Sequence, residues 1–104
     1  MNSVIKIGEQ EYKLKYTVRA LFVYERLTGK SYDLGGLMND YLLLYSILLA
    51  VNETFDMKFN DFIDQCDLNP SIFNEFKKWF LTILEQKATL QNQEKEEDTD
   101  KKKD

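Results

Sequence analysis

The sequence predicts an α+β fold that is mostly α, with an N-terminal β-hairpin followed by about four helices in a small bundle. Three observations lead to this prediction. Residues 3–16 alternate apolar and polar side chains, the segments that follow repeat apolar residues at helical spacing, and residues 91–104 contain no apolar side chain. We expect one globular domain over residues 1–90. Residues 91–104 should form a disordered, charged, flexible tail, because they cannot offset the entropy of ordering.

The hairpin is expected over residues 3–16. Ile5 and Ile7 share one parity and Tyr12 and Leu14 the other, with Gly8 between the two pairs. A two-residue loop (8–9) or a four-residue loop (8–11) places both pairs on one face, whereas a three-residue loop separates them. We prefer the four-residue loop, which pairs Ile7 with Tyr12 and Ile5 with Leu14.

The first helix is expected over residues 18–28. The Thr17 hydroxyl can accept a hydrogen bond from an amide of the first turn, and Gly29 can end the helix in the left-handed conformation. Glu25 falls at the same helical angle as apolar residues of this helix. It either reaches water or bonds locally to a lysine or to amides of residues 30–34, as a structural polar group, or it contacts a charge on a partner.

The second helix is expected over residues 40–52 and is apolar on nearly every side, as in a central buried helix. Asn39 or Asp40 can cap its start. Tyr41, Tyr45 and Leu48 form one line along it, whose hydroxyls suit the edge of water. These three residues and Leu81 are the candidate protein-binding residues, and the alternative is that they are ordinary surface apolar residues.

Two further helices are expected over residues 58–66 and 70–88. In the first, Phe59, Phe62 and Ile63 should face inward. Asp61, Asp64 and Asp67 recur every third residue, which does not fit a calcium loop and indicates an exposed acidic face. Asn69 and Pro70 mark the start of the last helix, as a cap and a first helical residue.

The composition argues against most chemistry. The chain has no histidine and a single cysteine, Cys66, which is expected to be packed rather than nucleophilic, so we predict no enzyme, metal site or cofactor. A net charge of −4 argues against nucleic acid binding. The longest apolar run has 11 residues, which is short of the roughly 20 that span a membrane. With no signal segment and a lone cysteine, we expect a soluble cytoplasmic protein.

Charge is unevenly distributed along the chain. Residues 1–30 carry six Lys and Arg against three Glu, whereas residues 31–67 carry one Lys against seven acidic residues. The two segments either attract each other within the fold or serve partners of opposite charge.

Taken in order, these segments resemble the tail assembly chaperones of long-tailed bacteriophages and prophages. The resemblance covers residues 3–88. It depends on the hairpin "IKIGEQEYKL" (5–14), the helix and turn "RALFVYERLTGKS" (19–31), an apolar helix with tyrosines, the acidic helix "FNDFIDQC" (59–66) and an Asn-Pro step before a long helix.

The resemblance implies a non-enzymatic binding protein of the bacterial host cytoplasm, absent from the mature virion. Its partner would be the tape measure protein, a long helical chain kept soluble during tail assembly, and also the tail tube protein. Two alternatives remain: a structural phage head–tail or tail component, and a small regulator that binds a host protein. The sequence leaves homo-oligomer formation open.

Overall fold

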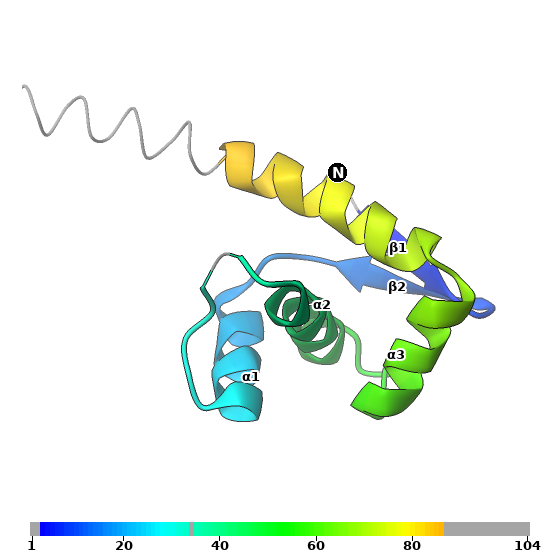
Figure 1. Cartoon of the computed structure of the whole chain (residues 1–104), viewed down its shortest axis with the longest axis horizontal. Coiled ribbons are helices and arrows are strands. Elements are labelled where there is room, and N and C mark those ends of the chain that lie inside the picture. The colour runs from blue at the N-terminus through cyan, green and yellow to red at the C-terminus, as the bar shows by residue number, and fades with distance from the viewer. Residues whose placement is uncertain (1–2, 34, 87–104) are drawn as a thin grey trace, which may run out of the picture.

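The computed structural model describes residues 3–33 and 35–86. In this part of the chain a hairpin precedes four helices, so the α+β, mostly α prediction is confirmed (Figure 1). The elements are β1 (Ser3–Ile7), β2 (Gln10–Leu14), α1 (Val18–Thr28), α2 (Leu37–Val51), α3 (Phe59–Leu68) and a last helix that includes residues 71–86. The predicted tail over residues 91–104 and the predicted end of the last helix near residue 88 lie outside the described residues.

The hairpin has a two-residue loop, so the preference for a four-residue loop was wrong. Ile5 pairs with Tyr12 and Ile7 pairs with Gln10, which leaves only Gly8 and Glu9 between the strands. Gly8 has a φ of 65°, and glycine at the first position of such a loop is typical of a type II′ turn, whose twist matches that of the strands. Loops of two and of four residues place the same side chains on the same face of the hairpin. Ile5, Ile7, Tyr12 and Leu14 therefore still face one side, and all four are buried.

Thr17 and Gly29 bound α1 as predicted. Thr17 is extended, and its Oγ1 accepts a hydrogen bond from the Ala20 amide at 3.0 Å. Gly29 has a φ of 78°, and its amide donates to the Glu25 carbonyl at 2.7 Å. Among the residues of α1, Ala20 and Tyr24 are buried. The helix therefore meets the core along a narrow strip.

The start of α2 differs from the prediction. The helix begins at Leu37 rather than at residue 40, and its cap is Gly36, with a φ of 90° and no side-chain cap bond. Two consecutive glycines with positive φ, Gly35 and Gly36, turn the chain into the helix. Asn39 and Asp40 lie inside the first turn rather than before it, and their side chains bond to other parts of the fold.

The acidic helix and the last helix follow their predicted patterns with small shifts at their ends. In α3, Phe62 is buried whereas Asp61 and Asp64 are exposed. The Asn69 side chain then accepts from the Ser71 amide at 3.2 Å, which caps the last helix.

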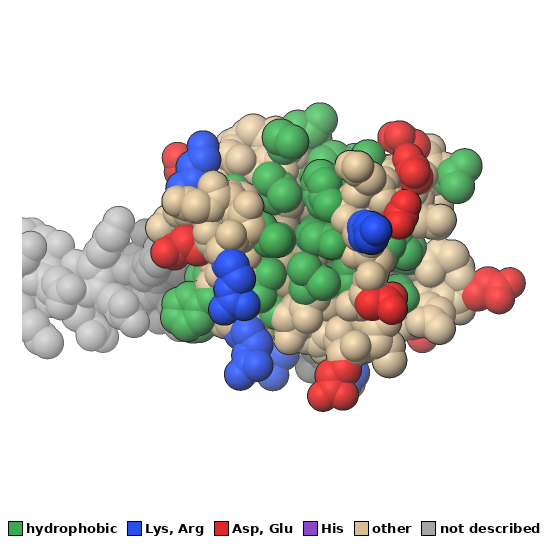
Figure 2. Space-filling view, turned by 90° about the horizontal axis from the view of Figure 1, so that it is seen from below, with side chains coloured by type: hydrophobic (Ala, Val, Ile, Leu, Met, Phe, Trp, Pro, Cys, Tyr) green, Lys and Arg blue, Asp and Glu red, His purple; other side chains and the backbone are tan. Residues whose placement is uncertain are grey.

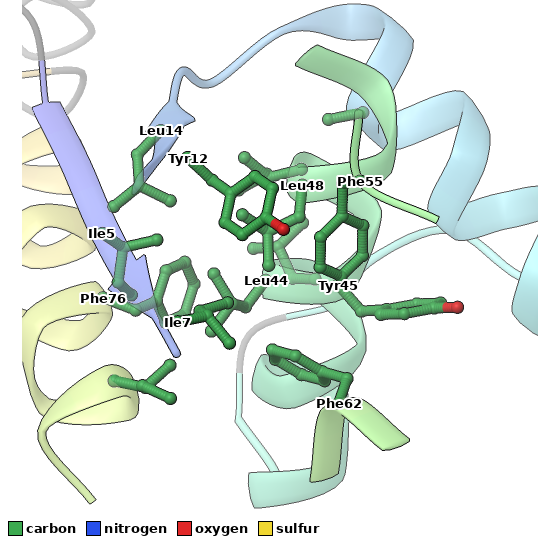
Figure 3. Close-up of a cluster of buried hydrophobic side chains, with 14 of the residues drawn as sticks. Ile5, Ile7, Tyr12, Leu14, Leu44, Tyr45, Leu48, Phe55, Phe62 and Phe76 are labelled. Atoms are coloured by element: carbon green, nitrogen blue, oxygen red, sulfur yellow. The ribbon is translucent and has the colours of Figure 1, made fainter. Parts of the chain in front are cut away.

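The core surrounds α2, which lies in the middle of the molecule with α1 on one side and α3 on the other (Figure 1). Figure 3 shows side chains of both strands, α2, α3 and the last helix pointing toward one another. Phe55, from the connection between α2 and α3, packs edge-to-face on Tyr12 with ring centroids 5.2 Å apart. Because neighbours cover several sides of α2, its apolar residues between Leu43 and Leu48 are buried, whereas Leu37 and Met38 in its first turn are 66% and 67% exposed.

Candidate protein-binding surface

Two of the predicted binding residues lie in the core. Leu48 is fully buried, with 0% of its surface exposed, and Tyr45 is also buried. The Tyr45 hydroxyl donates to the Met57 carbonyl at 2.6 Å, and its ring packs on Phe62 with centroids 5.5 Å apart. The expectation that this line of α2 reaches water was wrong for Tyr45 and Leu48. Phe62 of α3 and Phe55 of the connection before it cover the Tyr45 ring.

The other two predicted binding residues differ in exposure. The Tyr41 ring is half-buried and stacks on Phe73 at 4.0 Å between centroids. Burial, followed by the charges of Cys66 and Asp67, raises the pKa of Tyr41 above its usual value. Leu81, on the last helix, is 53% exposed. Of the four candidates, Leu81 alone is an exposed side chain, so they do not form the surface that was predicted.

Glu25 lies on the surface of α1. No described residue forms a hydrogen bond or ion pair with its carboxylate, so the expected local bond to a lysine or to the amides of residues 30–34 is not found in the described part of the loop. Its backbone carbonyl holds the end of the helix by accepting from Gly29. The exposed position of Glu25 agrees with the expectation that its carboxylate reaches water.

Two apolar residues that share the Glu25 side of α1, Val18 and Phe22, are exposed, whereas Leu21 is partly buried against the core. Val18 is 64% exposed and Phe22 is 62% exposed. Together with Val23 on α1 and Leu49 and Ala50 on α2, they line a groove of about 620 Å³ between the two helices. Figure 2 shows apolar side chains gathered on the underside of the molecule, with most of the visible Lys and Arg on the left and most of the Asp and Glu on the right. Large exposed apolar residues around a groove indicate an interaction site.

The groove was not predicted from the sequence, although a signal for it was present. Apolar residues occupy several sides of the helix that was expected over residues 18–28. A helix at the edge of a small domain can bury only one side, so a second apolar side must remain open or meet a partner. The sequence shows the surplus without showing which side remains open.

Basic side chains flank the groove. Arg19 and Arg26 line it, and Arg19 also lines a neighbouring groove of about 420 Å³ together with Lys13 and Lys15. The one ion pair between two described residues joins Lys77 to Asp40, which are remote from these cations in the sequence. The basic N-terminal segment is therefore not neutralised by the acidic segment through any ion pair among the described residues.

The polar side chains around Asp40 form a cluster with a structural role. Asp40 accepts from the Tyr32 hydroxyl at 2.8 Å and from Lys77 Nζ at 3.0 Å, and the Tyr24 hydroxyl donates to Asn39 at 3.2 Å. Burial, followed by the hydrogen bond to Asp40 and its charge, raises the pKa of Tyr32 above its usual value. In the described residues, no buried side-chain nitrogen or oxygen lacks a partner. This cluster therefore ties α1, the following loop and the last helix to α2.

Cys66 lies in the core, as expected, and carries a thiol that burial and the charge of Asp67 bring to a pKa of about 11. Little thiolate is present at neutral pH, which makes the group a poor nucleophile. No three His, Cys, Asp or Glu side chains in the described part of the chain come together in a way that could hold a metal ion. None of the described helices combines the length and the hydrophobicity that a membrane span requires.

The groove between α1 and α2 thus combines exposed apolar side chains, Val18 and Phe22, with arginines that form no ion pair with a described residue. Comparison of the chain with models of protein families, with curated proteins and with solved structures finds no match.

Proposed function

We propose that the chain is a non-enzymatic tail assembly chaperone of a long-tailed bacteriophage or prophage, which binds the tape measure protein and keeps it soluble during assembly. The observation that carries the proposal is the open apolar groove between α1 and α2, since a chaperone for a long helical chain needs a surface that covers apolar helix faces. The hairpin and the helices that follow it agree in order with what the resemblance over residues 3–88 implies.

Binding rather than catalysis is supported by the side chains available. The chain lacks histidine, and its one cysteine is buried with a raised pKa. General acid–base and nucleophilic catalysis depend most often on such groups in accessible positions. In this proposal the protein acts in the host cytoplasm and is absent from the mature virion.

Co-expression tests the proposal directly. The gene should lie beside a very long reading frame with helical periodicity, and the product of that frame should aggregate when it is expressed alone. With this chain present, we expect the long product to stay in the soluble fraction and to co-purify. A long product that precipitates equally with and without the chain would contradict the proposal.

The two alternatives predict different results. A structural tail or head–tail component would be found by mass spectrometry in purified particles, whereas a chaperone should be missing from them. A host-binding regulator would leave the tape measure protein insoluble and would capture a host protein instead. Co-purification of the tail tube protein would extend the proposal to a second partner.

A further inference from the structure

We infer that the groove between α1 and α2 is the docking site for an amphipathic helix of a partner protein, and that this helix carries acidic residues beside its apolar stripe. The naming of that partner as the tape measure protein rests on the proposed function. The site and the chemistry of its ligand rest on the groove itself, so the two ideas can fail separately.

The walls of the groove suit the apolar stripe of one helix. Val18 and Phe22 are one helical turn apart, so their side chains lie on the same side of α1. Leu49 and Ala50 face them from α2, and the small Ala50 side chain permits a close approach of a partner's backbone. Side chains at i, i+3, i+4 and i+7 of a helix are the groups that occupy such grooves.

The rim selects for negative charge. Arg19 and Arg26 border the apolar walls, and Lys13 and Lys15 continue the basic rim beside Thr17. Among the described residues that line these two grooves there is no Asp or Glu. Glu25 is exposed on the same helix but does not line either groove. Unpaired cations around an apolar site favour a partner with acidic residues and disfavour a basic one.

A second copy of this chain fits the groove less well. Its acidic helix, α3, offers Asp61 and Asp64 on its outer side, together with Leu68, which is 79% exposed. The larger apolar residues of that helix pack within its own domain: Phe62 is buried, and Phe59 and Ile63 are partly buried against the core. That helix would therefore bring charge without an apolar stripe that fills the groove.

Two labelled peptides of about 20 residues test the chemistry of the site, since a helix of that length spans about 30 Å. Both carry the same stripe of leucines at helical spacing, flanked by Glu in one and by Lys in the other. Fluorescence anisotropy with the full chain should show binding of the Glu peptide about tenfold tighter than binding of the Lys peptide. Equal affinity for the two peptides, or no binding of either, would overturn the inference.

Substitutions then locate the site. Phe22→Ser should weaken binding of the Glu peptide about tenfold or more, and Arg19→Glu with Arg26→Glu should reverse the preference between the peptides. Leu68→Ser and Lys6→Glu are matched controls, because they remove an exposed apolar side chain and an exposed charge elsewhere. All these residues are exposed, so circular dichroism and melting temperature should stay close to those of the unaltered chain. If Phe22→Ser binds the Glu peptide as tightly as the unaltered chain does, the groove is not the binding site.

The remaining outcomes separate the docking site from the proposed function. If Phe22→Ser and the double Arg variant keep the tape measure protein soluble as well as the unaltered chain does, the docking site is wrong and the function stands. If the unaltered chain binds the Glu peptide through the groove and does not rescue the tape measure protein, the function is wrong and the site stands. Self-association in light scattering that Phe22→Ser abolishes would assign the groove to a second copy and overturn the inference.

Discussion

Replacement of Asp40 by Asn tests the polar contact that ties α2 to the preceding loop and to the last helix. The carboxylate accepts from the Tyr32 hydroxyl at 2.8 Å and from Lys77 Nζ at 3.0 Å. Asparagine keeps the shape and one acceptor oxygen, but it removes the negative charge. Its oxygen can keep accepting from the Tyr32 hydroxyl while its amide nitrogen faces Lys77, so the ion pair is lost.

Two contributions set the size of the effect. A hydrogen bond to a charged group contributes about 1.5–3 kcal/mol, against about 1 kcal/mol for a neutral one, so the weaker bond to Tyr32 costs about 1 kcal/mol. The ion pair contributes about 0.5 kcal/mol, because the Lys77 side chain is 40% exposed and water screens it although Asp40 is only 11% exposed. The free energy of unfolding should therefore fall by about 1.5 kcal/mol, which lowers the melting temperature by about 6–12 °C.

Urea unfolding at neutral pH, followed by the fluorescence of Trp79, measures this loss. Asp64→Asn is the matched control, since Asp64 is exposed on α3, and we expect it to change the stability by less than about 0.5 kcal/mol. A double-mutant cycle with Lys77→Met should give a coupling of about 0.5 kcal/mol between Asp40 and Lys77. If Asp40→Asn costs no more than Asp64→Asn, the cluster does not stabilise the fold and this reasoning fails.

Three further predictions concern the core, the hairpin and alkaline pH. Phe76 is fully buried and stacks on Phe80 at 5.4 Å, so Phe76→Ala should cost about 3–5 kcal/mol in urea unfolding; a cost below about 1 kcal/mol would show that it is not a core residue. Asn52 bonds both the amide and the carbonyl of Lys13, at 2.8 and 3.0 Å, so Asn52→Ala should speed hydrogen exchange in β2, and unchanged exchange would contradict that role. The pKa of Cys66 rises from 9.0 to about 11 on folding. The protonated Cys66 thiol contributes fully to the free energy of unfolding below pH 9, and this contribution is lost as the pH rises toward 11. Between pH 8 and pH 10 the chain should lose about 1 kcal/mol more than Cys66→Ala does, and parallel curves for the two proteins would contradict the assignment.

Local patterns in the sequence were enough to predict much of the fold. The alternation in residues 3–16 identified the hairpin and its buried face, because strand parity is a property of the chain itself. Thr17, Gly29 and Asn69 marked helix ends correctly, because capping bonds join residues that are close in sequence. The resulting order of elements follows from these signals.

Tertiary structure decided what local patterns leave open. Parity allows loops of two and four residues equally, and only the observed pairing of Ile7 with Gln10 shows that the shorter loop is formed. An α2 that is apolar on nearly every side does not show which side faces outward. Ring contacts from Phe55 and from Phe62 of α3 cover Tyr45, and Leu48 is fully buried.

The same limit applies to α1, where the candidate site lies. Its sequence carries more apolar residues than one helix face can bury, and this surplus is visible without any structure. Only the placement of α1 against α2 shows that Ala20 and Tyr24 meet the core while Val18 and Phe22 remain open. The physical reason is that periodicity places residues on a helix face, whereas burial depends on neighbours contributed by distant parts of the chain.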